Sequence, residues 1–234
     1  MTEPQDACIC GTPAGQQLDV TLLAYRQIQS KFTWRDYRPI LFVDFHGTIS
    51  HQTFWNTLDR DHQEIIQAKI FSNSDFVGGW MRGVFDSRAA CRLASDLTGL
   101  CETYLLSQLL DSCSQFSVNR NVVRDLIRLR AHYQLVLITA NMDCFAAVAR
   151  KLRLFDVFDR IANSADFGLL KEDKNGLLFK IVADSTGADL RKAVLLDDSP
   201  EVCRVFSNLG GRAIQVRNTK DTSSQLRQLL SILE

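Results

Sequence analysis

The chain has 234 residues, and its 27 Lys and Arg residues balance its 27 Asp and Glu residues, so the formal net charge is zero. Since 46% of the residues are hydrophobic and 23% are charged, the composition is typical of a globular protein with one large domain or a domain carrying an insertion. The balanced charge argues against nucleic acid or a membrane surface as a partner, and no apolar run reaches the roughly 18 residues of a spanning helix.

The cysteines and the N-terminus indicate the compartment. The first fifteen residues lack the basic start and the apolar core of a secretory signal. Five of the seven cysteines lie in apolar, helix-like segments, where a free thiol behaves as a small hydrophobic side chain. Cys8 and Cys10 are too close for an ordinary disulfide and are assigned to a tail, with a metal or lipid role as the lesser alternative. A reducing, cytoplasmic compartment is therefore expected.

Three segments precede the middle of the chain. Residues 1–15 are expected to form a mobile tail, and residues 16–32 show helical periodicity. Residues 40–45 are a short, nearly continuous apolar run, as expected for a buried parallel strand. The segment 1–36 therefore precedes the first strand and is a candidate contact for a protein partner.

The character of the chain changes between residues 51 and 117. The β-favouring apolar runs disappear, and helical patterns occur over 87–97 and 102–113, with glycine breaks between the helical stretches. A helical insertion of four or so helices is expected here, as a cap domain covering residues 51–117.

Helices and strands then alternate to the C-terminus, which predicts a parallel sheet with helices on both faces. The expected fold is α/β, a Rossmann-like doubly wound core formed by residues 37–50 and 118–234, with the α-helical cap inserted. The expected helices are 119–132, 142–153, 175–186 and 222–233, and the expected strands are 134–139, 157–162, 193–196 and 213–216.

Ligands of such sheets bind beyond the carboxyl ends of the strands. Three carboxylates, Asp44, Asp197 and Asp198, follow two of the apolar runs, and like charges held close together need a cation. A hard divalent ion such as Mg²⁺ takes carboxylate and water oxygens and binds phosphate. The other residues at or just after the ends of expected strands are His46, Gly47, Thr48, Thr139 and Asn141, and Lys171 and Lys174 stand just before the helix expected from residue 175.

Four motifs in order resemble the haloacid dehalogenase (HAD) superfamily of aspartate-nucleophile hydrolases, and within it the phosphatases with a helical (C1-type) cap. The first motif is Asp44-Phe45-His46-Gly47-Thr48, and the second is LVLITAN, which contains Thr139. The third is a lysine before the acidic pair, for which Lys174 fits best and Lys171 is second, and the fourth is LLDDS. The resemblance covers roughly residues 37–220.

This resemblance implies a Mg²⁺-dependent phosphatase that acts on a small phosphorylated substrate through a phospho-aspartate on Asp44. Mg²⁺ would be held by the side chains of Asp44, Asp197 and Asp198 and by the backbone carbonyl of His46. The resemblance also implies that four residues bind the phosphoryl group: Thr48, Thr139, Asn141 and Lys174. Thr48 would in addition brace the first loop.

His46 departs from the family, whose phosphatases carry an aspartate there as general acid and base. Imidazole titrates near neutrality and can perform the same proton transfers. Three interpretations stay open: a working acid/base, a replacement that leaves only slow turnover or binding, or a non-phosphatase branch. The acidic pair counts against a dehalogenase, and phosphonate cleavage would need a lysine from the cap, where only Lys69 offers itself.

Two functional hypotheses follow, an active phosphatase and a HAD-fold binding or regulatory protein that uses residues 1–36. Trp55 and Trp80 are expected in the core, while His51 and Arg82 are candidates to touch substrate. The stripe Arg120, Arg124 and Arg128 is expected to be a solvated face.

Overall fold

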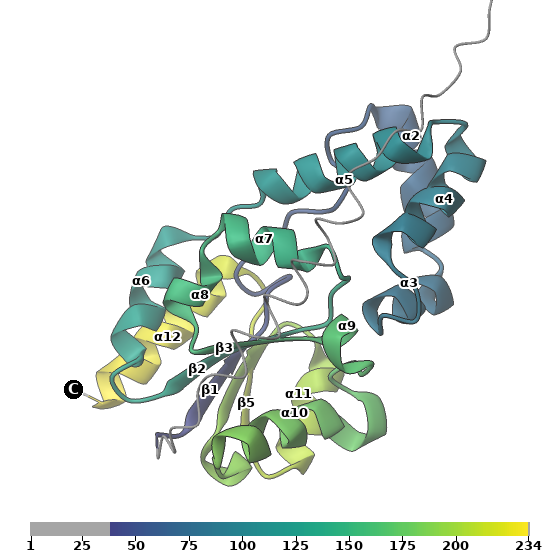
Figure 1. The fold of residues 1–234 in the computed structure, drawn as a ribbon. Helices are drawn as coiled ribbons and strands as arrows, with labels where there is room; N and C mark the ends of the chain where they lie inside the picture. The colour runs from purple at the N-terminus through teal and green to yellow at the C-terminus, as the bar shows by residue number, and fades with distance from the viewer. Residues whose placement is uncertain (1–37, 234) are drawn as a thin grey trace, which may run out of the picture.

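The computed structural model describes residues 38–233 (Figure 1). The expected tail, the expected helix over 16–32, the pair Cys8 and Cys10 and the suggested partner contact through residues 1–36 lie outside the described residues. Within them, no helix combines the length and the apolar character that crossing a membrane requires.

The core is a five-stranded sheet in which every neighbouring pair of strands is parallel. The strand order is β3-β2-β1-β4-β5, so β1 is central and the chain builds first to one side of it and then to the other. This confirms the expected doubly wound α/β architecture. The strands are β1 (Ile40–Val43), β2 (Gln134–Thr139), β3 (Arg160–Asn163), β4 (Val194–Asp197) and β5 (Arg212–Gln215).

The register of β1 aligns the carboxyl ends of the three inner strands. Val43 pairs with Leu137 of β2 on one side and with Leu196 of β4 on the other. The residues that follow Val43, Leu137 and Leu196 therefore emerge at one edge of the sheet. This edge is the topological switch point, where sheets of this kind bind ligands.

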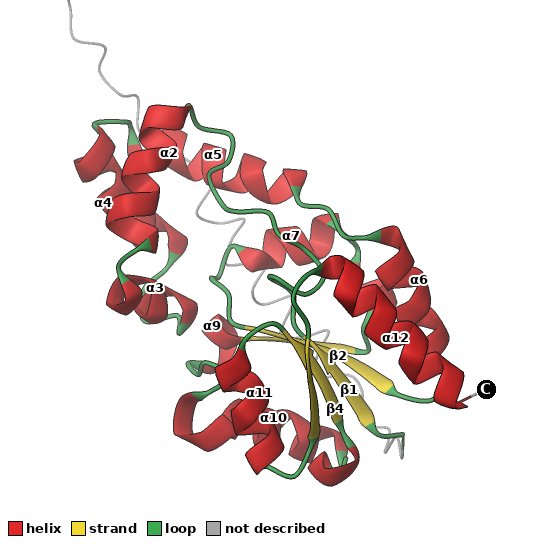
Figure 2. Cartoon of the chain, turned by 180° about the vertical axis from the view of Figure 1, so that it is seen from behind, coloured by secondary structure: helices red, strands yellow, loops and turns green. Residues whose placement is uncertain are grey.

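Helices cover both faces of the sheet (Figures 1 and 2). Alternate residues of β1 point to opposite faces, so Leu41 and Val43 belong to one hydrophobic core while Ile40 and Phe42 belong to the other. The first face is covered by α6 (Arg120–Leu129), α7 (Phe145–Lys151), α8 (Leu154–Val157) and α12 (Thr219–Leu233), and the second by α10 (Asp173–Thr186) and α11 (Pro200–Asn208).

Four α-helices lie between β1 and α6, beyond the carboxyl ends of the strands (Figure 1). Trp55 and Trp80 are buried among them, 1% and 0% exposed, which confirms their expected core positions. The assignment of residues 51–117 as a separate cap domain stays a prediction, and the segment is called the helical insertion below. Its elements are α2 (Arg60–Ile66), a π-helical turn (Gln67–Phe71), α3 (Ser74–Met81), α4 (Ser87–Thr98) and α5 (Glu102–Gln115).

One expected strand differs from the structure, and two helices were not expected. The strand expected over 157–162 begins later, because Leu154–Val157 forms the short helix α8 and β3 is Arg160–Asn163. The short helix α9 (Ser164–Phe167) and the helix α11 were not expected. α11 has a clear start signal, since the Ser199 side chain accepts a hydrogen bond from the backbone N–H of Val202 and Pro200 follows at the first helical position.

The described cysteines fit their expected role as hydrophobic side chains. Cys91, Cys113, Cys144 and Cys203 are buried, Cys101 is partly buried, and all five are free thiols. Burial raises the pKa of the Cys91 thiol to about 12, so this group stays protonated and unreactive at neutral pH.

Candidate active site

Asp44 and Asp197 stand side by side at the carboxyl edge of the sheet. The backbone N–H of Asp44 donates to the carbonyl of Leu196 over 2.9 Å, which continues the β1–β4 ladder by one residue beyond Val43. Asp44 is 4% exposed and Asp197 is fully buried. One Asp197 oxygen, Oδ1, accepts a hydrogen bond from the backbone N–H of Ser199 over 2.9 Å, which fixes the orientation of this carboxylate.

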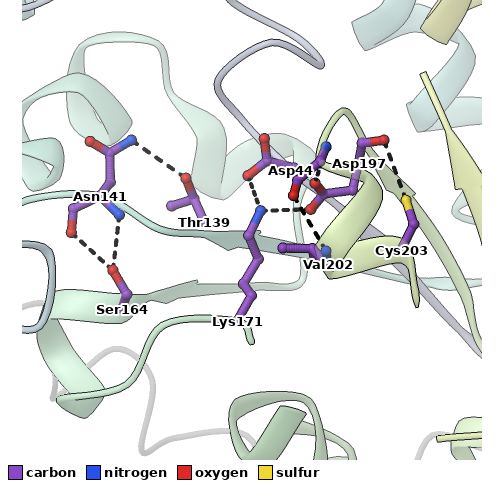
Figure 3. A network of polar contacts seen from close by, with 9 residues as sticks. Asp44, Thr139, Asn141, Ser164, Lys171, Asp197, Val202 and Cys203 are labelled. Atoms are coloured by element: carbon purple, nitrogen blue, oxygen red, sulfur yellow. Dashed lines mark hydrogen bonds and ion pairs between the residues drawn. The ribbon is translucent and has the colours of Figure 1, made fainter. Parts of the chain in front are cut away.

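Lys171 joins these two carboxylates (Figure 3). Its Nζ donates to Asp44 Oδ1 and to Asp197 Oδ2, over 2.6 Å in each case. Burial alone would lower the pKa of Lys171, but the two carboxylates outweigh it and raise this pKa above its usual value. The ammonium is therefore charged at neutral pH and held rigidly between the acids.

The geometry places Lys171, the second choice for the third motif, beside the carboxylates, so Lys171 is the lysine that we propose for this motif. Lys174 is exposed and lies in a turn of three residues with positive φ, 174–176, at the start of α10. Lys171 precedes that turn, and its side chain extends into the sheet edge. Composition favoured neither lysine, because the stretch KEDKNG is polar throughout; only the tertiary position of the carboxylates distinguishes them.

Asp198 completes a cluster of three carboxylates. One oxygen from each of Asp44, Asp197 and Asp198 lies within 4.8 Å of the others. Gly47, in the first motif, has a φ of 77°, and a Cβ at this position would lie 2.1 Å from Asp198 Oδ2. The first and fourth motifs are thus in direct contact, and only glycine fits between them.

The charge balance of this cluster fits a divalent cation. Three carboxylates face one ammonium, which leaves an excess of negative charge in a largely buried site. Burial raises the pKa of Asp44 well above its usual range, and the charges of Asp197 and Asp198 act in the same direction while Lys171 opposes them. Burial and the charge of Asp197 also raise the pKa of Asp198. A hard cation with oxygen ligands would relieve this repulsion.

A second polar group lies at the end of β2. Thr139 is its last residue, and Asn141 Nδ2 donates to Thr139 Oγ1 over 3.4 Å (Figure 3). Ser164, just after β3, accepts from the backbone N–H of Asn141 over 2.9 Å and donates to the carbonyl of Met81 in the helical insertion over 2.6 Å. Ser164 was not predicted, although it follows the observed end of β3 directly and the strand expected there ended only one residue earlier, at residue 162.

Thr48 lies behind the first loop. Its side chain is buried and its Oγ1 has no hydrogen-bond partner among the described residues. Its backbone carbonyl accepts a hydrogen bond from Thr222 Oγ1 of α12 over 2.8 Å. This placement fits the bracing role expected for Thr48, while direct contact with phosphate stays a prediction.

His46 occupies the turn after Asp44 and remains exposed. Desolvation lowers the pKa of this imidazole below its usual value, and the negative charge of Asp198 opposes the shift. The ring lines a cavity of about 270 Å³ that reaches to the helical insertion, where Phe54 and Phe71 contribute to the wall. His46 is therefore placed between the carboxylate cluster and an open cavity.

Several contacts hold the insertion over this edge. Trp80 Nε1 and Ser87 Oγ both donate to Asp143 Oδ1, over 2.9 and 2.6 Å. Arg82, a candidate for substrate contact, instead forms an ion pair with Asp173, close to Lys171 in the chain. The stripe Arg120, Arg124 and Arg128 is exposed, as expected.

Neither the protein-family models nor the curated proteins include a match to this sequence. The structure does resemble solved structures. A HAD-family enzyme from Bacteroides thetaiotaomicron, in complex with magnesium and inorganic phosphate, aligns with a TM-score of 0.59 and 17% identity, over 76% of this chain and 94% of that chain. A predicted HAD-like family hydrolase from Porphyromonas gingivalis aligns with a TM-score of 0.64 and 17% identity, over 83% and 98% of the two chains.

A third similar structure is a 2-haloacid dehalogenase from Pseudomonas syringae pv. Tomato, with a TM-score of 0.61 and 17% identity over 84% of this chain and 100% of that chain. At these identities the likeness establishes the fold. The chain therefore has the fold of HAD-family hydrolases, as the four sequence motifs indicated, and the neighbours include both a phosphate-binding enzyme and dehalogenases.

Proposed function

We propose that the protein is a Mg²⁺-dependent phosphomonoester hydrolase that acts through a phospho-aspartate on Asp44. The observation that carries this proposal is the convergence of Asp44, Asp197, Asp198 and Lys171 at one edge of the sheet. Phosphoryl transfer depends mainly on positioning and on neutralising the charge of the phosphoryl oxygens. Both requirements are served by a fixed ammonium and a carboxylate cluster that attracts a cation.

The residues of the chain divide the reaction into two displacements. In the first, an oxygen of Asp44 attacks phosphorus, the bond from phosphorus to the leaving oxygen breaks, and the His46 imidazolium gives its proton to that oxygen. In the second, His46 takes a proton from water as this water attacks phosphorus, and the bond from phosphorus to Asp44 breaks. Inorganic phosphate leaves, and Asp44 is again a free carboxylate.

Asp44, Asp197 and Asp198, with the backbone carbonyl of His46, would hold Mg²⁺, which would supply charge neutralisation for the phosphoryl oxygens. The neighbouring enzyme solved with magnesium and inorganic phosphate supports this choice of ion and ligand. Lys171 and Thr139 are proposed to bind the phosphoryl oxygens, and Asn141 to orient Thr139 through its amide. Lys171 then serves in the role first expected of Lys174.

The acidic pair favours a phosphatase over a dehalogenase. A dehalogenase of this fold displaces halide from carbon and has no need of a second and third carboxylate for a metal. Here the ammonium of Lys171 faces Asp44 and the fully buried Asp197, and Asp198 adds a third carboxylate, so the cluster keeps an excess of negative charge that a metal ion would balance. Dehalogenation is therefore the lesser alternative, although the fold is shared.

A catalytically impaired binding protein is the second candidate, and His46 is the observation that favours it. Without an aspartate two residues after the nucleophile, loss of the phosphoryl group from Asp44 depends on an imidazole whose pKa is lowered by desolvation. Such a protein would accumulate phospho-Asp44 rather than turn over.

One experiment distinguishes these candidates. Hydrolysis of an aryl phosphate is measured with Mg²⁺, with a chelator and for Asp44→Asn, and the protein is analysed by intact mass after a rapid acid quench. Mg²⁺-dependent turnover that is lost in Asp44→Asn supports the phosphatase. A stable mass increase of one phosphoryl group on the native chain without turnover supports the impaired protein, and the absence of both contradicts the phospho-aspartate.

A further inference from the structure

The cavity beside His46 is built mainly from aromatic and aliphatic side chains. It has a volume of about 270 Å³, just below the range of roughly 300–1,000 Å³ that is usual for small-molecule sites. His46 and Asn141 line the cavity where it meets the carboxyl edge of the sheet. Its other walls come from both the core and the helical insertion and include Phe45, Phe54, Phe71, Phe116, Met81 and Met142.

No Asp, Glu, Lys or Arg side chain is among the described residues that line this cavity. Arg60 and Glu64 line a second cavity that shares Phe54 and Phe71, but they neutralise each other through an ion pair of 2.8 Å. Apart from His46, whose imidazole the proposed reaction uses for proton transfer at the leaving oxygen, no described residue that lines the first cavity could offset a charge on the ligand. Burying a charged group there would cost several kcal/mol without compensation, whereas an apolar group would be stabilised.

The polar lining residues outside the sheet edge are Gln52, Thr53 and Gln67, which are uncharged and offer a ligand no ion pair. The side-chain amide of Gln52 is already hydrogen-bonded and links the two ends of the insertion. Its Nε2 donates to the carbonyl of Gln115, and its Oε1 accepts from the backbone N–H of Ser117. Gln67 is exposed and is the first residue of the π-helical turn, in which Phe71 is the last. Single π-helical turns occur frequently at functional sites, and this one supplies two of the lining side chains.

We propose that this cavity binds the leaving group of the substrate, and that this leaving group is an uncharged, largely apolar alcohol or phenol of small size. The substrate class is then a phosphate monoester whose only charge is the phosphate itself. Sugar bisphosphates, nucleotides and phosphorylated carboxylic acids are poor fits. This inference rests on the proposed function, because it assigns the cavity to the group that departs from phosphorus.

A matched pair of esters tests the inference. The first is 2-naphthyl phosphate, and the second carries an additional carboxylate at position 6 of the same ring system. We expect kcat/KM to be at least about tenfold higher for the uncharged ring, mainly through KM, because the carboxylate finds no partner in the cavity. Equal or better hydrolysis of the carboxylated ester, with the protein active, would overturn the inference and leave the proposed function standing.

Two arginine variants localise the effect. Gln67→Arg places a cation at the cavity and is expected to improve the carboxylated ester relative to the uncharged ester by about tenfold. Ala68→Arg adds the same charge at the neighbouring exposed position, which lines neither cavity, and is expected to leave the ratio unchanged. A ratio that moves equally in both variants would show that long-range attraction, rather than the cavity, selects the substrate.

Binding of the alcohols alone separates the inference from catalysis. Dissociation constants are measured for 2-naphthol and 6-hydroxy-2-naphthoate by naphthol fluorescence on the native protein. Tighter binding of 2-naphthol supports the ligand class. If 2-naphthol binds but neither ester is hydrolysed, the proposed function fails and the leaving-group assignment fails with it. Equal binding of the two compounds, or no binding, overturns the assigned ligand class directly.

Discussion

Arg82 and Asp173 form an ion pair with two hydrogen bonds, in which Nε donates to Oδ2 and Nη2 donates to Oδ1, each over 2.7 Å. Arg82 closes α3 of the helical insertion, and Asp173 lies two residues after Lys171. Asp173 Oδ2 also accepts from the backbone N–H of Leu170 over 2.8 Å. The insertion is thereby fastened to the segment that carries the ammonium of the candidate active site.

Removing this ion pair should loosen the insertion. We expect Arg82→Ala to lower the free energy of unfolding by about 1 kcal/mol, since the pair is bidentate but partly exposed. Arg60→Ala is the matched control, because Arg60 pairs with Glu64 on a well-exposed surface and should contribute much less. Urea unfolding of the three proteins checks the prediction, and equal losses in both variants would contradict it.

The same ion pair should make the effect of Arg82→Ala depend on pH. The hydrogen bonds from Arg82 hold the pKa of Asp173 below its usual value, despite an opposing contribution from burial. A depressed pKa contributes stability above the unfolded value of about 3.9 and loses it as the pH falls through the folded pKa. The difference between wild type and Arg82→Ala should therefore be full at pH 7 and shrink below about pH 4. Urea unfolding at pH 7, 5 and 3.5 measures it; a constant difference would assign the effect to packing.

Substitution of Lys171 should lower kcat strongly, whereas substitution of Lys174 should not. Lys171→Met removes a buried ammonium that contacts two carboxylates, and we expect kcat to fall by at least about 100-fold, the usual effect of losing one group that stabilises transition-state charge. Lys174→Met changes an exposed side chain and should leave kcat within about twofold. Steady-state kinetics at saturating Mg²⁺ decide the point, and the reverse order would restore the original assignment of Lys174.

The proton transfer assigned to His46 should appear as a dependence on the leaving group. We expect His46→Ala to lower kcat/KM by about 100-fold for phenyl phosphate and by much less for 4-nitrophenyl phosphate, whose phenolate departs without a proton. His46→Asp should restore the hydrolysis of phenyl phosphate, because a carboxylic acid can make the same transfer. If His46→Ala slows both esters equally, His46 has a structural rather than an acid/base role.

We expect that no other residue can replace Gly47, because of a steric contact in addition to its positive φ. Gly187 has a similar φ, 73°, but a Cβ there would meet nothing within 4 Å, whereas at Gly47 it would collide with Asp198. Gly187→Ala should cost about 1 kcal/mol of stability through its positive φ alone and keep full activity. Gly47→Ala should in addition displace Asp198 and raise the Mg²⁺ concentration needed for half-maximal activity. Equal behaviour of the two variants would exclude a role for the Gly47–Asp198 contact.

Much of the fold could be predicted from the sequence, because its information is local. The strand Gln134–Thr139 is a continuous apolar run, and the helices Ser87–Thr98 and Glu102–Gln115 have clear periodicity. The start of β3 was harder to predict, since the apolar residues around Leu154–Val157 fit a short helix as well as a strand.

Of the candidate site, only the residues whose place follows from the end of a strand could be predicted from the sequence. Asp44, Thr139 and Asp197 each lie at or just after a strand end, so topology alone brings them to one edge. The choice of Lys171 depended on which ammonium reaches two buried carboxylates, and this is a tertiary property. The cavity was not predictable at all, since it arises where the insertion packs over the first loop.

The central position of β1 has a consequence for synthesis on the ribosome. Among the described strands β1 is the first to be made, yet both of its partners come later, at Gln134–Thr139 and Val194–Asp197. At about 5–20 residues per second, both edges of β1 stay unpaired for roughly 5–20 s before β2 exists, and longer before β4 does. The helices of the insertion form from contacts close in sequence and are complete first. During this interval the nascent chain holds folded helices beside an apolar strand whose two edges are unpaired. This is therefore the stage at which we expect the chain to be most prone to aggregation and most dependent on a chaperone.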